Sequence, residues 1–146
     1  MEKLFITIDP EGISLPVIET GLKLGRSLNA EVVLVSIVPT KVNVAIASSG
    51  VPYGAEQLDA ELAMINEYLT KVKNENADMH ISIHSTIGEV RQTLLEFIKS
   101  SNPTLVVIGT HGRTGFEQIF MGGTAEYLVR HSTVPLVVVP FNKIEH

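Results

Sequence analysis

Five short runs of β-branched and other apolar residues alternate with segments of helical periodicity along the 146-residue chain. The runs occupy residues 3–9, 31–38, 79–85, 104–110 and 135–140, and each is bounded by residues typical of turns. Strands joined through helices form right-handed crossovers and run parallel, which places helices on both faces of the sheet. The pattern therefore predicts an α/β fold, with one open, doubly wound sheet of five parallel strands, in a single domain over residues 1–146.

Four segments between the strands have the periodicity of amphipathic helices. Residues 14–28 begin with Ser14 as an N-cap, and Gly21 and Gly25 lie four residues apart, where they would allow a close approach to the strands. Residues 55–76 carry apolar residues at spacings of four and three, so one apolar stripe runs along the helix. The positions that mark this helix and the two that follow it are Leu58, Leu62, Ile65, Leu69 and Val72; Val90, Leu94, Phe97 and Ile98; and Ala125, Leu128 and Val129.

The run at 79–85 differs from the others because polar residues alternate with apolar ones. His80, Ser82 and His84 occupy every second position, so one face of this strand is expected to be more exposed to solvent. The strand is therefore expected to lie at an edge of the sheet. Four strand residues separate His80 from His84 by about 13 Å, which is too far for one metal ion to bind both. We therefore expect no metal site here.

Composition restricts the class of partner. The net charge is −5, with 45% apolar and 18% charged residues, so the chain lacks the basic surface that binding to nucleic acid or an anionic membrane requires. The chain has no cysteine, the first residues are expected to form a strand rather than a signal peptide, and no long apolar run resembles a membrane span. These features favour a cytoplasmic protein.

The stretch VVIGTHGRTGFEQIFMGGTAEYLVRHSTVPLVVVP, residues 106–140, holds several glycines between two strands. Glycines leave backbone N–H groups free to point into one concavity, and the helix after the last pair adds unpaired N–H groups and a positive dipole end. We expect an anion site, for phosphates, at the carboxyl ends of the strands. The residues expected to contribute are Gly109, Gly112, Gly122 and Gly123, with Arg113 and the hydroxyls of Thr110, Thr114 and Thr124. The alternative is that the glycines serve only tight turns and close helix–strand contact.

The glycine spacing resembles that of the universal stress protein family. Gly109, two residues, Gly112, nine residues and Gly122 reproduce G-x2-G-x9-G, and GTHGRTG and TAEYLVRHSTVPLVVVP resemble the C-terminal half of the family. The resemblance extends over the whole chain, including a first strand that ends in Asp9 and the sequence VSIV in the second. It implies a Rossmann-like fold of the adenine nucleotide alpha hydrolase type with strand order 3-2-1-4-5. It also implies the ATP-binding branch, with ATP or another adenine nucleotide as ligand, with or without Mg²⁺.

Carried onto this chain, the resemblance assigns residues to each part of the nucleotide. Asp9 with Thr7 and Ile8, together with Ile37, would hold the adenine and ribose, and Ile108 and Gly109 would line the adenosine pocket. His111, Gly112 and Arg113 would contact the phosphates or the ribose. Gly122, Gly123 and Thr124 would receive the phosphate tail.

This chain departs from the family pattern directly after the third glycine. The pattern has Ser or Thr there, whereas this chain has Gly123, and Thr124 follows one place later. The backbone N–H is retained but a hydroxyl is lost, and an ordinary hydrogen bond contributes roughly 0.5–1.5 kcal/mol. We expect weakened rather than abolished binding. Gly123→Ser is expected to strengthen binding unless Thr124 already supplies the hydroxyl.

No catalytic constellation is identified, and neither G-x-x-x-x-G-K-[ST] nor G-x-G-x-x-G occurs. The first hypothesis is therefore a nucleotide-binding regulatory module of the stress response. Two alternatives remain open: a slow ATPase that uses Asp9 as a metal or water ligand, and a structural stress protein whose pocket stays empty.

The last strand suggests self-association. Residues 134–141 carry no charge, and an apolar edge strand invites pairing. The family resemblance implies that two final strands pair antiparallel. We expect a homodimer in which Val137 and Val139 meet their counterparts and Val138 faces the other side of the sheet, with the tail FNKIEH folding back over the strand as the alternative.

Overall fold

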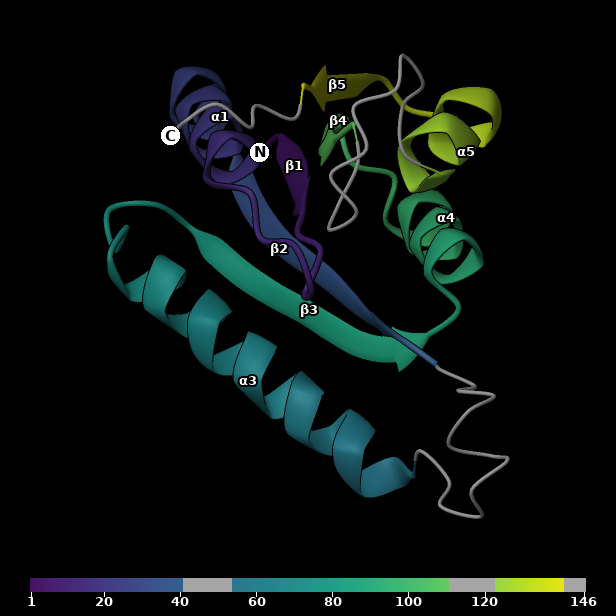
Figure 1. Ribbon diagram of the computed structural model, residues 1–146. Helices are drawn as coiled ribbons and strands as arrows, with labels where there is room; N and C mark the ends of the chain where they lie inside the picture. Colours follow the sequence, from purple (N-terminus) through teal and green to yellow (C-terminus); the bar gives the residue numbers. More distant parts are fainter. Residues whose placement is uncertain (41–53, 111–122, 141–146) are drawn as a thin grey trace.

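The structure is a computed structural model, and it describes residues 1–40, 54–110 and 123–140. Its strands are β1 (Lys3–Thr7), β2 (Glu31–Pro39), β3 (Ile81–Gly88), β4 (Leu105–Gly109) and β5 (Leu136–Val139). Its helices are α1 (Leu15–Leu28), α3 (Ala55–Asn74), α4 (Val90–Ser101) and α5 (Gly123–His131). The strands pair in parallel in the order β3-β2-β1-β4-β5 (Figure 1). The predicted doubly wound sheet is confirmed.

The sheet separates two hydrophobic cores. On one face Leu4 and Ile6 of β1 pack with α1 and α3, and on the other Phe5 packs with α4 and α5. Figure 1 shows α4 and α5 on the opposite side of the sheet from α3. Leu4, Phe5 and Ile6 are fully buried, because β1 lies in the middle of the sheet with helices over both faces.

The start of α1 and its approach to the sheet follow from the sequence. The Ser14 side chain accepts a hydrogen bond from the Val17 backbone N–H, 3.4 Å away, as an N-cap does. A β-carbon at Gly21 would overlap the Ile6 side chain, and one at Gly25 would lie 2.7 Å from Val32 Cγ2. The two glycines thus allow the close contact that their spacing predicts.

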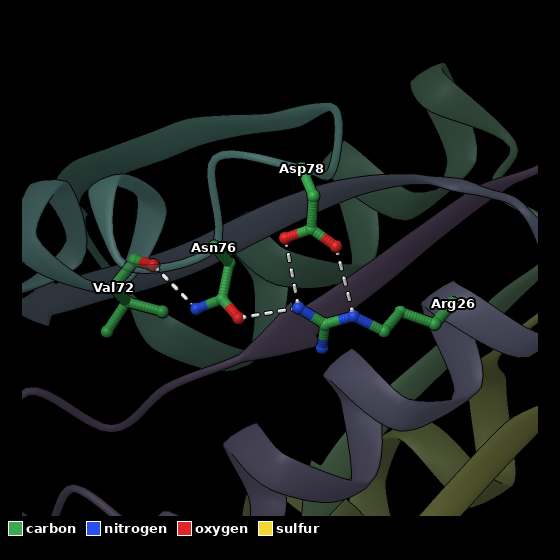
Figure 2. A network of polar contacts seen from close by, with 4 residues as sticks. All are labelled: Arg26, Val72, Asn76 and Asp78. Carbon is green, nitrogen blue, oxygen red and sulfur yellow. Dashed lines mark hydrogen bonds and ion pairs between the residues drawn. The ribbon is translucent and has the colours of Figure 1, made fainter.

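The far end of α1 is tied to the connection between α3 and β3 (Figure 2). Arg26 donates to both carboxylate oxygens of Asp78, at 3.2 and 3.3 Å, and to Asn76 Oδ1 at 2.9 Å. Asn76 in turn donates to the Val72 carbonyl near the end of α3 at 2.8 Å. The hydrogen bonds from Arg26 lower the pKa of the Asp78 carboxyl below its usual range. All of this lies at the amino-terminal end of the sheet.

Two details of the sequence-based expectation are wrong. β3 lies at an edge as expected, but it spans Ile81–Gly88 rather than 79–85. His84 is half-buried and stacks on Phe97 of α4, with ring centroids 3.7 Å apart, so this position is not part of a wet face. Val129 lies in α5 as expected, although it is 51% exposed. Ala125 and Leu128 are the buried residues of α5, and Tyr127 packs beside them in part.

None of the described helices is long and apolar enough to cross a membrane.

Candidate functional site

A pocket of about 180 Å³ opens at the carboxyl ends of β1, β2 and β4. The first turns of α1, α4 and α5 close it, α1 from one face of the sheet and α4 and α5 from the other. β1 lies between β2 and β4, which are reached through helices on opposite faces, so the pocket occupies the place where the winding of the sheet reverses. Doubly wound sheets bind their ligands at this place.

Most of the residues expected to bind the ligand line this pocket. Those that do are Thr7, Ile8, Asp9, Ile37, Ile108, Gly109, Gly123 and Thr124. They come from the ends of three strands and the start of α5, so residues more than 100 positions apart meet in one cavity. His111, Gly112, Arg113 and Gly122 were also expected to bind, and they lie outside the described residues.

The end of β1 is held in place by main-chain and hydroxyl contacts. The Ile8 N–H donates to the Val35 carbonyl at 2.8 Å, and the Ser36 hydroxyl donates to the Ile8 carbonyl at 2.7 Å. Ser36 is only 1% exposed, and it is the buried polar residue of the described core. Because both polar groups of Ile8 are engaged, the backbone that leads into Asp9 has a fixed direction.

Asp9 begins the turn between β1 and α1. One of its carboxylate oxygens accepts a hydrogen bond from the Glu11 N–H at 2.9 Å, and its carbonyl accepts one from the Gly12 N–H at 3.2 Å. The side chain is half-buried and borders the pocket. A carboxylate that borders the cavity can accept a hydrogen bond from a hydroxyl or an amino group of a ligand.

The inner wall of the pocket is apolar. Val35 and Ile37 of β2, Leu94 of α4 and Ile108 of β4 are all buried, and Ala125 of α5 joins them. Thr7 lies among them, but its hydroxyl donates to the Val107 carbonyl at 3.1 Å within the sheet. A wall of this kind suits a flat, apolar group such as the face of a nucleobase.

The opposite rim of the pocket is formed by backbone. Gly109 ends β4 and Thr110 follows it, and the Thr110 N–H donates to the Val139 carbonyl at 2.9 Å. Gly123 and Thr124 are the first residues of α5, where helix N–H groups have no partner within the helix and the dipole is positive. The pocket therefore offers an apolar wall at one side and N–H donors at the other.

Several residues of this site escaped the sequence analysis. Pro10, Gly12, Pro39 and Val90 also line the pocket, as do Val17 and Leu94. Pro39 is the last residue of β2, Pro10 and Gly12 follow β1, and the others lie in the first two turns of α1 and α4, so the rule that ligands bind at strand ends could have found them. Glu89 directly follows the last residue of β3, and its side chain caps α4 by accepting from the Gln92 N–H at 2.9 Å.

No metal centre accompanies the pocket in the part of the chain that the structure describes. Within it, no three His, Asp or Glu side chains come together as metal ligands do.

The fold and this pocket define a doubly wound α/β domain with a ligand site at the switch point of its sheet. Comparison with known proteins makes the class more specific. The model of the universal stress protein family matches residues 1–140, and the chain belongs to that family.

Individual relatives agree with this assignment. A universal stress protein of Methanocaldococcus jannaschii is 28% identical over 148 residues, which cover 99% of this chain and 85% of that protein. Among solved structures, UspA from Lactobacillus plantarum superposes with a TM-score of 0.77 at 17% identity, over 94% of this chain and 97% of that one. The family member from Arabidopsis thaliana with AMP bound gives 0.65 at 13% identity, over 98% and 94% of the chains. A universal stress protein in complex with cAMP gives 0.62 at 15% identity, over 97% and 98%.

Proposed function

We propose that this protein binds an adenine nucleotide in the switch-point pocket and acts as a cytoplasmic regulatory module of the stress response. The observation that carries the proposal is the pocket itself, which joins an apolar wall to a rim of backbone N–H groups at the start of α5. A nucleotide has the same two parts, a flat base and an anionic phosphate group. Two structural relatives were solved with AMP and with cAMP, which supports adenine as the base.

The apolar wall and the N–H rim of the pocket indicate how the nucleotide would be oriented. The base would lie against Ile37 and Ile108, and the ribose hydroxyls would face the Asp9 carboxylate. A carboxylate repels phosphates, so it suits the sugar and base end of the ligand. The phosphates would extend toward Gly123 and Thr124, where the N–H groups and the dipole of α5 favour negative charge. The residues 111–113 and 122 remain proposed phosphate contacts.

Calorimetric titration with a panel of adenine and guanine nucleotides tests the proposal. ATP, ADP or AMP should bind and guanine nucleotides should bind far more weakly, because the site is proposed for adenine. A ligand that binds only the folded protein should also raise the melting temperature. If no adenine nucleotide binds and none shifts the melting temperature, the protein is a structural member of the family and the proposal is wrong.

A slow ATPase is the second candidate, and the position of Asp9 favours it. The carboxylate borders the pocket, where it could hold a metal ion or a water molecule. ATP with Mg²⁺ should then release phosphate at a steady rate, and Asp9→Asn, which keeps an oxygen for the turn to Glu11 and removes the charge, should abolish the release. Binding without turnover would leave the regulatory module as the function.

The edge position of β5 supports a second copy of the chain as a partner. β5 pairs with β4 on one side and with no other described strand on its other side. Within the described residues, Val137 and Val139 pack with the core on the α1 face and Val138 packs on the opposite face. We propose that two β5 strands pair about a two-fold axis, so that the protein is a homodimer whose mass light scattering can measure.

A further inference from the structure

Arg91 and Gly123 come from different helices, and the Arg91 guanidinium lies against Gly123, a residue that lines the pocket. Arg91 is the second residue of α4, and Gly123 is the first residue of α5 and lines the pocket. A β-carbon built on Gly123 would overlap Nη2 of Arg91 and would lie 3.3 Å from its Cζ. The guanidinium therefore fills the space that a side chain at position 123 would take.

The helix alone does not account for the glycine at position 123. Helical backbone dihedrals accept residues that have a β-carbon, and glycine is among the poorest helix formers. A glycine at the start of α5 is thus explained by what lies against it, and the Arg91 guanidinium is what lies there.

Among the residues that the structure describes, no carboxylate forms an ion pair with Arg91. Within the described residues the ion pairs are Arg26–Asp78 and Arg130–Glu126, and neither involves Arg91. The guanidinium lies beside the first turn of α5, the positive end of that helix, where a cation is unfavourable unless an anion is also present. A phosphate group at this rim would meet both the guanidinium and the N–H groups of α5.

We propose that Arg91 is a phosphate-binding residue of the pocket and that its guanidinium takes the place of a side-chain donor at position 123. The proposal rests on the proposed nucleotide site. It also accounts for the departure from the G-x2-G-x9-G-[S/T] pattern, since the hydroxyl missing from position 123 is replaced by a charged donor from α4. Arg91 then decides how strongly the site prefers phosphorylated ligands over the bare nucleoside.

The first test compares ATP with adenosine. Both are titrated into the wild type and into Arg91→Ala, with Lys99→Ala as the matched control because Lys99 is an exposed cation at the other end of the same helix. Charge-assisted hydrogen bonds to phosphate are stronger than neutral ones, so Arg91→Ala should weaken ATP by about tenfold or more. Adenosine affinity should not change, and Lys99→Ala should match the wild type for both ligands.

The second test uses Gly123→Ser in two backgrounds. From the sequence alone the serine hydroxyl should strengthen binding, but with Arg91 present the new side chain must displace the guanidinium. Arg91 is exposed and its side chain is long, so the fold should tolerate this, and the gain should be lost or reversed. In the Arg91→Ala background the space is empty, and Gly123→Ser should recover part of the lost ATP affinity.

The outcomes separate this inference from the proposed function. Equal ATP affinity of the wild type and Arg91→Ala, or an equal gain from Gly123→Ser in both backgrounds, would overturn the role of Arg91 and leave the nucleotide site standing. A parallel loss of ATP and adenosine in Arg91→Ala would also overturn it, because the pocket rather than a phosphate contact would then have changed. If the wild type binds neither ligand, the proposed function and this inference both fall.

Discussion

Asp9 has two tasks at the end of β1. One carboxylate oxygen holds the turn into α1 through the Glu11 N–H, and the residue also lines the pocket. A substitution to alanine would remove both contacts at once and could not tell them apart. Asparagine keeps an oxygen for the turn and removes the charge, so it reports on the ligand contact.

Asp9→Asn is expected to weaken ATP and AMP by similar factors, about tenfold, because a hydrogen bond from a ribose or base to a charged group contributes roughly 1.5–3 kcal/mol. The two nucleotides share the part of the ligand that Asp9 is proposed to contact. Calorimetric titration with both ligands measures the two factors. A loss confined to ATP would contradict this role and point to metal coordination by Asp9.

His84 shows how a polar residue can become part of the core. Its ring stacks on Phe97 with an interplanar angle of 12°, and Phe97 stacks in turn on Phe5. Burial lowers the pKa of the His84 imidazole below its ordinary value of 6.5. The folded protein therefore holds the neutral ring, while the unfolded chain takes up a proton as the pH falls through 6.5.

The free energy of unfolding should consequently fall as the pH drops below about 6.5, with the loss complete once the pH is below the lowered pKa of the folded state. His84→Phe should remove this part of the pH dependence, because phenylalanine can stack on Phe97 without titrating. Urea unfolding between about pH 8 and about pH 5 measures this pH dependence of the free energy of unfolding. His80→Gln is the control, because His80 is exposed. The lowered pKa of Asp78 changes the free energy of unfolding in a separate pH range, which begins near 3.8 and extends to lower pH. If His84→Phe and the wild type lose stability in parallel, His84 is not the group responsible.

At the scale of the helices and strands, the sequence predicted what depends on periodicity and missed what depends on side chains that meet in space. The parallel strands, the N-cap at Ser14 and the close approach at Gly21 follow from local patterns and from the rules for parallel sheets, and the strand order was implied by the family resemblance. The stack of His84 on Phe97 joins residues from β3 and α4. The alternation of polar residues in the sequence, taken alone, indicates a solvent-exposed face of the strand. The contact between Arg91 and Gly123 likewise joins two helices that no local pattern relates.

The packing of α1 gives a prediction at this scale. Gly21→Val should lower the free energy of unfolding by about 1–3 kcal/mol, the usual cost of adding atoms to a filled core. Ile6, which the new side chain would meet, is fully buried. Chemical denaturation measures the change. Ser27→Val places the same residue on the exposed side of α1 and should change the stability little; equal effects of the two substitutions would contradict the close contact.

At the scale of the whole molecule, the two ends of the sheet and its two edges have different characters. The amino-terminal end carries the network of Arg26 with Asp78, and the carboxyl-terminal end carries the pocket. At the β3 edge, His80 directly precedes the strand and Ser82 lies within it, and both are exposed polar residues. In contrast, β5 is apolar from Leu136 to Val139. An apolar edge strand is a ready partner for another strand, and polar residues at an edge discourage such pairing.

The backbone N–H and C=O groups of β5 alternate in direction along the strand. A substitution can therefore disrupt hydrogen bonding at the open edge of β5 and leave its hydrogen bonds to β4 intact. The carbonyls of Pro135 and Val139 accept from the N–H groups of Val106 and Thr110 of β4. Along a strand the N–H and C=O of each residue point to the same side and alternate from one residue to the next. The polar groups of Val137 therefore face β4, and those of Leu136 and Val138 face the open edge.

We expect the wild type to be a dimer through this edge, and Val138→Pro to be a folded monomer. Proline removes the Val138 N–H, which a second β5 strand would need, and proline is tolerated on an edge strand where the N–H faces outward. Val137→Pro is the matched control: it removes an N–H directed at β4 and should lower the melting temperature of the chain itself. Light scattering at micromolar concentration gives the mass, which is 15.9 kDa for one chain and twice that for a dimer. A wild-type mass equal to one chain would rule the dimer out, and a Val138→Pro mass still equal to two chains would move the interface away from β5.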